Sequence, residues 1–300
     1  MADAIQQLSP PPPSDAVLLE GAPAISMRDV RKSFGPKVIY RGLDLRVEEG
    51  ETHVVIGRSG EGKSVLLKHI CGLLAPDSGV VEVEGCPVDA HKPKSLRFIR
   101  DRVTMVFQMG ALFDSMTVRK NVGFYLDQQK NKPQAEIDQL CEKLLEEVNL
   151  PNTGHLLPSE LSGGMRKRVG LARALAVEPR IILYDEPTTG LDPVTSQVIN
   201  ELIVKTRDLH AVTSIVVTHD MKSAMYVGDR ISMLYEGMII FTGTPGELED
   251  CPDPVVQQFI HGDSDGPITN KEFEGVQRMS QTLINRSQIL RKLDELDREE

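Results

Sequence analysis

A glycine-rich segment between an apolar run and a helical pattern constrains the fold of this chain more than any other feature. The segment fits the spacing G-x-x-x-x-G-K-[ST] and consists of Gly57, Arg58, Ser59, Gly60, Glu61, Gly62, Lys63 and Ser64. Thr52–Ile56 before it predicts a buried strand, and Lys63–Ile70 predicts a helix. This order indicates an α/β fold in which a mostly parallel sheet carries a phosphate loop at a strand end.

The residue types in this loop suit a nucleotide. The three glycines let the backbone curl so that successive N–H groups point at phosphate oxygens, a path that a Cβ would obstruct. Lys63 supplies a positive charge for the β- and γ-phosphates, and the N-terminal end of the helix favours the same anion. Ser64 can place its hydroxyl on Mg²⁺, and Val65 completes the predicted nucleotide-binding set.

A second apolar run ends in two carboxylates. Ile181–Tyr184 predicts a buried strand, and Asp185 and Glu186 follow it directly. Asp185 suits the Mg²⁺ shell, and Glu186 suits a catalytic role, polarising the water that attacks the γ-phosphate. The alternative is that the carboxylate pair caps a helix that starts near Pro193.

Two single polar residues follow further apolar runs. Gln108 comes after Val103–Phe107, and its amide can reach Mg²⁺ or the water. His219 comes after Ile215–Thr218, and its imidazole can form a hydrogen bond with the γ-phosphate. A lone histidine at a strand end is usually structural, which is the alternative for His219. Because parallel sheets bind ligands at the carboxyl ends of their strands, we predict that both residues join the catalytic site.

The pentad LSGGM at Leu161–Met165 narrows the prediction to one superfamily. With it, the chain resembles the ATP-binding subunits of ABC transporters over roughly residues 25–262. The resemblance implies ATP hydrolysis, with ATP and Mg²⁺ as ligands. It also assigns Gly57–Ser64 to Walker A, Gln108 to the Q-loop, Leu161–Met165 to the signature, Asp185 and Glu186 to Walker B, Gly190–Pro193 with Asp192 to the D-loop, and His219 to the switch. Met165 departs from the Gln of many relatives, but the backbone and Ser162 should still bind phosphate.

The same resemblance implies an adenine contact and a homodimer. Phe34 would stack on adenine, and the alternative is an ordinary core phenylalanine. Ser162, Gly163 and Gly164 of one subunit would contact the γ-phosphate bound by the other, with two ATP molecules between head-to-tail protomers. Ser162 is also predicted to cap a helix that runs through Leu175, so that the dipole of this helix faces the phosphate.

A longer segment, Phe107–Val118, resembles the FQ-x-GALFDS-x-TV run of ATPases from Mla and Mce-associated lipid transporters. Leu161–Leu175 and the late segments Gln257–Gly262 and Gly266–Ile268 resemble the same subfamily. The resemblance implies phospholipid movement between the inner and outer membranes of a Gram-negative-type envelope. Its implied partners are an integral membrane permease, an Mce-domain lipid-binding protein and a possible STAS-domain regulator.

Other functions stay open at this point. Ala111–Phe113 could dock the permease or only pack inside the helical region. The ATPase could instead serve amino-acid uptake, drug export or lipoprotein release. ABC proteins of DNA repair and translation are a more remote alternative, because they carry long coiled-coil insertions or paired domains that this sequence lacks.

The composition favours a peripheral motor subunit. A formal net charge of −10 disfavours a nucleic-acid partner, and Arg166–Arg168 is interpreted as the solvated flank of a helix. No apolar run approaches the roughly 18 to 20 residues that span a bilayer, so another chain must form the pore. Without a visible secretory signal or a C-x-x-C pair, the four cysteines are expected to be free thiols. We expect the chain on the cytoplasmic face of the inner membrane.

The predicted layout has three parts. Residues 1–23 are an extended, disordered Pro-rich lead; residues 24–262 are the ATPase domain, with a helical subdomain at about 109–178; residues 263–300 are a linker and a C-terminal helix. Antiparallel strands are expected at 24–30 and 38–47, two more strands at 230–235 and 238–242 across the Glu236-Gly237 turn, and helices at 118–129, 134–148 and 221–225. The last helix, with an apolar stripe from Val276 to Leu293, packs on either the partner protomer or its own domain.

Overall fold

A six-stranded sheet carries the strand ends that the sequence singles out. The strand order is β10-β9-β3-β8-β7-β6, in which β9, β3, β8, β7 and β6 are parallel and β10 is antiparallel at one edge. The strands are β3 (Thr52–Ile56), β6 (Val103–Val106), β7 (Ile181–Asp185), β8 (Thr213–Thr218), β9 (Arg230–Tyr235) and β10 (Met238–Gly243). The computed structural model describes residues 21–129 and 132–269 of the chain.

The register of the parallel strands brings their carboxyl ends to one edge. Ile56 pairs with Thr218, Val217 with Asp185, and Tyr184 with Val106. The residues that follow these positions therefore emerge side by side, which is where a parallel sheet of this type binds its ligands. β6 ends at Val106 rather than at the predicted Phe107.

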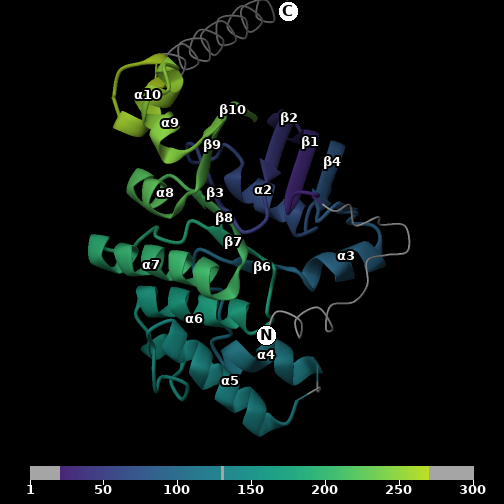
Figure 1. Ribbon diagram of the computed structural model, residues 1–300, viewed down its shortest axis with the longest axis vertical. Helices are drawn as coiled ribbons and strands as arrows, with labels where there is room; N and C mark the ends of the chain where they lie inside the picture. Colours follow the sequence, from purple (N-terminus) through teal and green to yellow (C-terminus); the bar gives the residue numbers. More distant parts are fainter. Residues whose placement is uncertain (1–20, 130–131, 270–300) are drawn as a thin grey trace, which may run out of the picture. The chain divides into compact units, whose positions relative to one another are not determined.

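Helices cover both faces of this sheet, which explains its continuous apolar strands. Every residue of β3 and of β8 is buried. The helix α2 (Lys63–Ile70) lies between the six-stranded sheet and a second sheet, whereas α8 (Met221–Val227) packs against β3 and β8 beside α7 (Pro193–His210) on the other side (Figure 1). Asp192 caps α7 by accepting hydrogen bonds from the N–H groups of Val194 and Thr195, each 3.0 Å long.

The second sheet is antiparallel, with the order β2-β1-β4-β5. Its strands are β1 (Ile25–Phe34), β2 (Lys37–Val47), β4 (Ser78–Val83) and β5 (Cys86–Pro87). Buried side chains of β1 and β2 form the main core with the apolar face of α2. The antiparallel pairing of β1 with β2 confirms the prediction, but β4, β5 and the short helix α3 (Pro93–Arg100) were not predicted.

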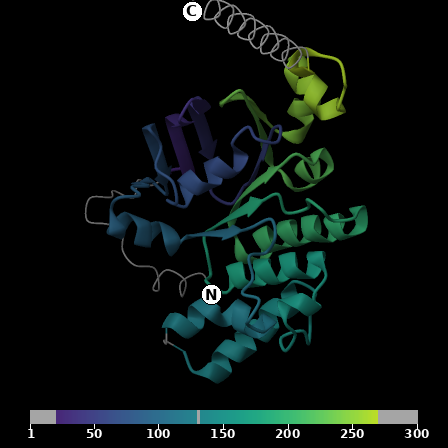
Figure 2. The same ribbon diagram turned by 180° about the vertical axis from the view of Figure 1, so that it is seen from behind.

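Three helices form a separate region of the same unit, drawn in teal below the six-stranded sheet in Figure 2. They are α4 (Val118–Gln129), α5 (Gln134–Glu147) and α6 (Gly163–Leu175), with a short 3-10 turn at Pro158–Glu160. The backbone at Gly110, which leads into this region, lies directly against α6, because a Cβ on Gly110 would sit 2.8 Å from the carbonyl oxygen of Arg166. The predicted inserted helical subdomain is therefore present, as is the mixed α/β fold.

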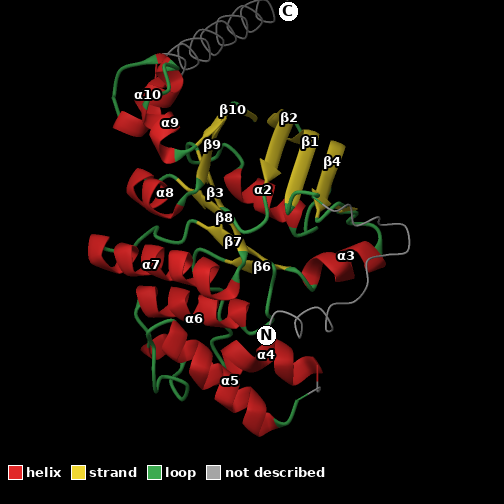
Figure 3. Cartoon of the chain, viewed as in Figure 1, coloured by secondary structure: helices red, strands yellow, loops and turns green. Residues whose placement is uncertain are grey.

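The described residues divide into two compact units, with the boundary between Pro245 and Gly246. In the part of the chain around this boundary that the structure describes, α10 (Pro254–His261) follows α9 (Pro245–Glu249) (Figure 3). The buried Gln258 side chain accepts a 2.7 Å hydrogen bond from the N–H of Ile268. The predicted domain limit at residue 262 stays a prediction. Most of the Pro-rich lead and the predicted C-terminal helix lie outside the described residues.

Within the described residues, none of the helices has the length and apolar character needed to cross a membrane.

Candidate nucleotide-binding and hydrolysis site

The phosphate loop lies tightly against neighbouring backbone and side chains. A Cβ added to Gly57 would sit 2.5 Å from the carbonyl oxygen of Leu234 in β9, and one on Gly62 would sit 2.6 Å from Cγ2 of Ile39 in β2. Gly62 also has a φ of +106° and accepts a 2.6 Å hydrogen bond from the Tyr40 hydroxyl. These contacts hold the loop in the curled path that a phosphate cradle needs.

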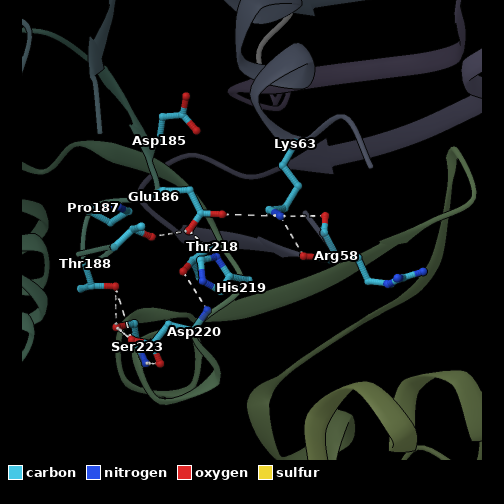
Figure 4. Close-up of polar contacts among 12 residues, drawn as sticks. Arg58, Lys63, Asp185, Glu186, Pro187, Thr188, Thr218, His219, Asp220 and Ser223 are labelled. Atoms are coloured by element: carbon cyan, nitrogen blue, oxygen red, sulfur yellow. Dashed lines mark hydrogen bonds and ion pairs between the residues drawn. The ribbon is translucent and has the colours of Figure 1, made fainter. Parts of the chain in front are cut away.

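Lys63 is the first residue of α2 and its ammonium group is buried in the loop. Its Nζ donates to the carbonyl oxygens of Gly57, at 2.8 Å, and Arg58, at 3.1 Å, and lies 3.5 Å from Oε1 of Glu186 (Figure 4). The positive charge is therefore fixed between the phosphate loop and the end of β7. The Val65 N–H donates to the Gly62 carbonyl at 2.8 Å, while the Glu61 side chain accepts a 2.9 Å bond from the N–H of Glu236.

Ser64 and Asp185 form an oxygen pair at the end of β7. The Ser64 hydroxyl donates to Oδ1 of Asp185 at 2.8 Å. Burial raises the pKa of Asp185 above its usual value, against the opposing effect of the Ser64 hydrogen bond, and the nearby charge of Glu186 adds to the rise. Oxygen ligands of this kind suit Mg²⁺, which keeps several waters and needs only one or two protein groups besides phosphate. In the described ranges, no group of three or more His, Cys, Asp or Glu side chains could hold a metal ion.

Glu186 follows β7 with a φ of +50°, in the left-handed region that side-chain-bearing residues rarely adopt. Its Oε2 lies 2.9 Å from Nδ1 of His219 and accepts a 3.0 Å hydrogen bond from the Thr189 hydroxyl. The helix that starts at Pro193 is capped by Asp192 and not by Asp185 or Glu186. The capping alternative for the carboxylate pair is therefore wrong.

His219 directly follows β8, and its side chain is 54% exposed. Its contact with Glu186 links the ends of two neighbouring strands, as Figure 4 shows. The next residue, Asp220, caps α8 by accepting hydrogen bonds from the N–H groups of Lys222 and Ser223. The histidine thus lies at an open strand end beside a carboxylate.

Phe34 and Gln108 are both exposed at the ends of their strands. The Phe34 ring is 48% exposed and has the Lys32 ammonium 5.4 Å from its centroid, which excludes the core alternative. Gln108 lies two residues beyond the end of β6. The structure therefore brings Lys63, Ser64, Asp185, Glu186 and His219 into direct contact and leaves these two side chains open to solvent.

The LSGG segment leads into α6. Ser162 is exposed and caps α6, accepting a 3.3 Å hydrogen bond from the N–H of Met165, as predicted. Gly163 is also exposed, whereas a Cβ on Gly164 would meet Cγ2 of Thr195 at 2.5 Å. Thr195 in turn donates to Oδ2 of Asp192 at 2.6 Å. The signature and the D-loop are therefore neighbours in space.

The basic triplet on α6 is not a solvated flank, and that prediction is wrong. Lys167 is only 7% exposed and donates to the carbonyl oxygens of Pro187 and Thr189. Arg168 donates to the carbonyl of Asn149 at 2.8 Å. One signal could have revealed the role of Lys167, because it lies three residues after Gly164 and four before Leu171, on the buried stripe of the helix.

We expect the Asp185→Asn variant to raise the Tm of the chain at neutral pH when Mg²⁺ and ATP are absent. The raised pKa means that ionising Asp185 costs more in the folded than in the unfolded chain, and the neutral amide removes that cost while still accepting from Ser64. The gain should disappear as the pH falls below the usual aspartate value of about 4. Thermal denaturation across pH measures both effects.

The same variant should respond poorly to Mg²⁺ and ATP. A ligand at one hundred times its Kd stabilises a protein by about 2.7 kcal/mol, and most of this gain should be lost with Asp185→Asn. Asp77→Asn is the matched control, because a hydrogen bond from Lys32 lowers the pKa of Asp77 and its loss should lower the Tm. Equal shifts in the two variants would contradict the burial argument.

Known proteins agree with this geometry. A family model described as ABC transporter matches residues 40–189. The chain is 38% identical to the intermembrane phospholipid transport system ATP-binding protein MlaF of Escherichia coli K12, over 81% of this chain and 91% of that protein. It is 43% identical to the protein trigalactosyldiacylglycerol 3, chloroplastic, of Arabidopsis thaliana, over 81% and 75% of the two chains.

A solved structure supports the same assignment. The ATP-binding cassette MJ0796, in a dimeric post-hydrolysis state bound to ADP and Pi, is 30% identical and covers 74% of this chain and 98% of its own, with a TM-score of 0.68. These matches extend well beyond the phosphate loop. The predicted family is confirmed: the chain belongs to the ABC transporter family and is an enzyme that hydrolyses ATP.

Proposed function

We propose that this chain is the ATPase subunit of a transporter that moves phospholipid between two membranes. The observation that carries the proposal is the similarity to a phospholipid-transport ATP-binding protein over 91% of that protein's length. The segment Phe107–Val118, which resembles lipid-transporter ATPases and continues ten residues beyond Gln108 of the Q-loop, supports the same proposal. A relative named for a galactolipid supports a lipid cargo as well.

Each residue of the site has its own role in ATP hydrolysis. Lys63 and the loop N–H groups bind the β- and γ-phosphates, and Glu186 accepts the proton of the attacking water. His219 orients Glu186 and can form a hydrogen bond with the γ-phosphate, and exposed Phe34 stacks on adenine. Ser64 and Asp185, with Gln108, hold Mg²⁺, which when bound neutralises charge on the phosphates.

The working unit is a head-to-tail homodimer. The cassette MJ0796 is dimeric, and the present chain exposes Ser162 and Gly163 at the start of α6. The N–H groups that stay unpaired at a helix start suit a phosphate, here one bound to the partner protomer. Asp192, next to the signature through Thr195, lies at the same contact.

A membrane permease docks near the exit of β6. Three of the exposed large apolar side chains follow β6 closely in the sequence: Phe107, Phe113 and Met109, the last 75% exposed. Phe113 also packs on Phe124 with ring centroids 4.7 Å apart, so packing inside the helical region and docking are compatible. By analogy with Mla-type systems, the complex contains an MlaE-like permease, an MlaD-like Mce-domain protein and an MlaB-like STAS-domain regulator, at the cytoplasmic face of an inner membrane.

Purification of the tagged chain from detergent-solubilised membranes of its host, followed by mass spectrometry, tests this proposal. We expect a permease and an Mce-domain protein with the wild-type chain. Met109→Lys should lose the permease, whereas Leu209→Lys, a matched change at another exposed apolar side chain on α7, should retain it. A solute-binding protein in place of the Mce-domain protein would indicate uptake and contradict lipid movement.

A further inference from the structure

One buried cation outside the phosphate loop lies close to the proposed catalytic carboxylate. Lys167, on α6, donates to the carbonyl oxygen of Pro187 at 2.8 Å and to that of Thr189 at 2.6 Å. Both acceptors belong to the turn that follows Glu186. Burial lowers the pKa of Lys167, and the charge of Glu186 opposes this effect. An ammonium group buried at such a cost is kept only where its hydrogen bonds are well satisfied.

The turn that Lys167 holds also holds Glu186. The hydroxyl of Thr189 donates to Oε2 of Glu186 at 3.0 Å, and the N–H of Thr189 donates to the Glu186 carbonyl at 3.3 Å. The left-handed backbone of Glu186 is unfavourable for a residue with a side chain and persists only where its surroundings enforce it. Lys167 therefore fixes the residue that positions the carboxylate.

The helix that carries Lys167 also begins at the signature. Lys167 lies five residues after Ser162, the cap of α6, and belongs to the helix that presents the signature to a partner protomer. A shift of α6 therefore shifts the ammonium group and the two carbonyls bound to it. The neighbouring Arg168 instead donates hydrogen bonds to the carbonyl oxygens of Val148 and Asn149, at the end of α5.

We propose that Lys167 is a positioning residue, which transmits the placement of the signature helix to Glu186 through the carbonyls of Pro187 and Thr189. Glu186 is then held for proton transfer only when α6 is docked in its proper place. This inference rests on the proposed role of Glu186 as the base for ATP hydrolysis. The two hydrogen bonds of the Lys167 ammonium group go to Pro187 and Thr189, and neither goes to the phosphate loop or to Asp185.

The test compares Lys167→Met with Arg168→Met in the full-length chain, within the complex purified through it. Each change removes a cation that binds two carbonyls of another segment, but only the first removes the restraint on the turn after Glu186. We expect Lys167→Met to lower kcat by about 10- to 100-fold, with KM for ATP changed less than about two-fold, because a small misplacement of a catalytic group acts on the chemical step. Lys167→Arg should recover part of kcat, and Arg168→Met should stay near the wild type.

Two outcomes would overturn the inference. One is an equal kcat for Lys167→Met and the wild type. The other is a parallel loss of activity and Tm in both Met variants without recovery by Arg, which indicates a structural role alone. If Lys167→Met does not fold, Lys167→Gln, which keeps an amide donor, replaces it under the same criteria. Unchanged turnover in Glu186→Gln would instead overturn the role of Glu186, so the two failures are distinguishable.

Discussion

The Glu186→Gln variant is expected to lower kcat for ATP hydrolysis by about 10²- to 10⁴-fold, the range that a general base contributes. The amide keeps the shape of the side chain and its hydrogen bond from Thr189, but it cannot accept the proton of the attacking water. Removal of the negative charge also ends the ion pair with Lys63, at 3.5 Å, and alters the 2.9 Å contact with Nδ1 of His219. ATP binding should persist, and with ATP the variant should be a stable dimer.

Steady-state phosphate release and light scattering measure these two effects. Glu201→Gln is the matched control, because Glu201 lies exposed on α7 and its side chain accepts a hydrogen bond only from Gln197 among the bonds described for it. Its kcat should equal that of the wild type. A Glu186→Gln chain that turns over normally, or that stays monomeric with saturating ATP, would contradict the proposed site.

The Lys63→Met variant is expected to weaken ATP binding by about 100-fold. A hydrogen bond to a charged group contributes about 1.5 to 3 kcal/mol, and each 1.4 kcal/mol is a factor of ten in Kd. Met keeps the length of the side chain without the charge that lies between the loop carbonyls and Glu186. The change should therefore remove the attraction for phosphate with little loss of packing.

Titration calorimetry with ATP and Mg²⁺ measures this Kd. Lys68→Met is the matched control on the same helix, since Lys68 is exposed in the last turn of α2, and its Kd should change less than about three-fold. Equal effects of the two substitutions would mean that the general charge of α2, and not the position of Lys63, determines binding.

The elements that the sequence predicts best have strong local signals. The bounds of α4 and of β9 agree with the prediction, because each element has an apolar pattern with clear turn residues at its two ends. By contrast, β4 begins with three exposed residues and is a strand because it pairs with β1, more than forty residues earlier in the chain. Pairing of this kind depends on tertiary contacts that a local pattern does not contain.

The same distinction applies to the site. Residues at strand ends are predictable because the carboxyl ends of parallel strands converge whatever the rest of the fold does. The contact of Glu186 with Thr189 and the burial of Lys167 depend on how α6 packs against the turn after β7. Lysine and arginine are rarely fully buried, so three adjacent basic residues predict a solvent-exposed segment. Only the packing of α6 shows that Lys167 is buried.

The most direct test of the central claim, that ATP hydrolysis at this site drives lipid movement, is transfer of a fluorescent phospholipid by the purified complex in proteoliposomes. Transfer to acceptor vesicles should require ATP and Mg²⁺, should stop with Glu186→Gln and should continue with Glu201→Gln. Transfer at the wild-type rate with Glu186→Gln, or rapid ATP hydrolysis without any phospholipid transfer, would contradict the account.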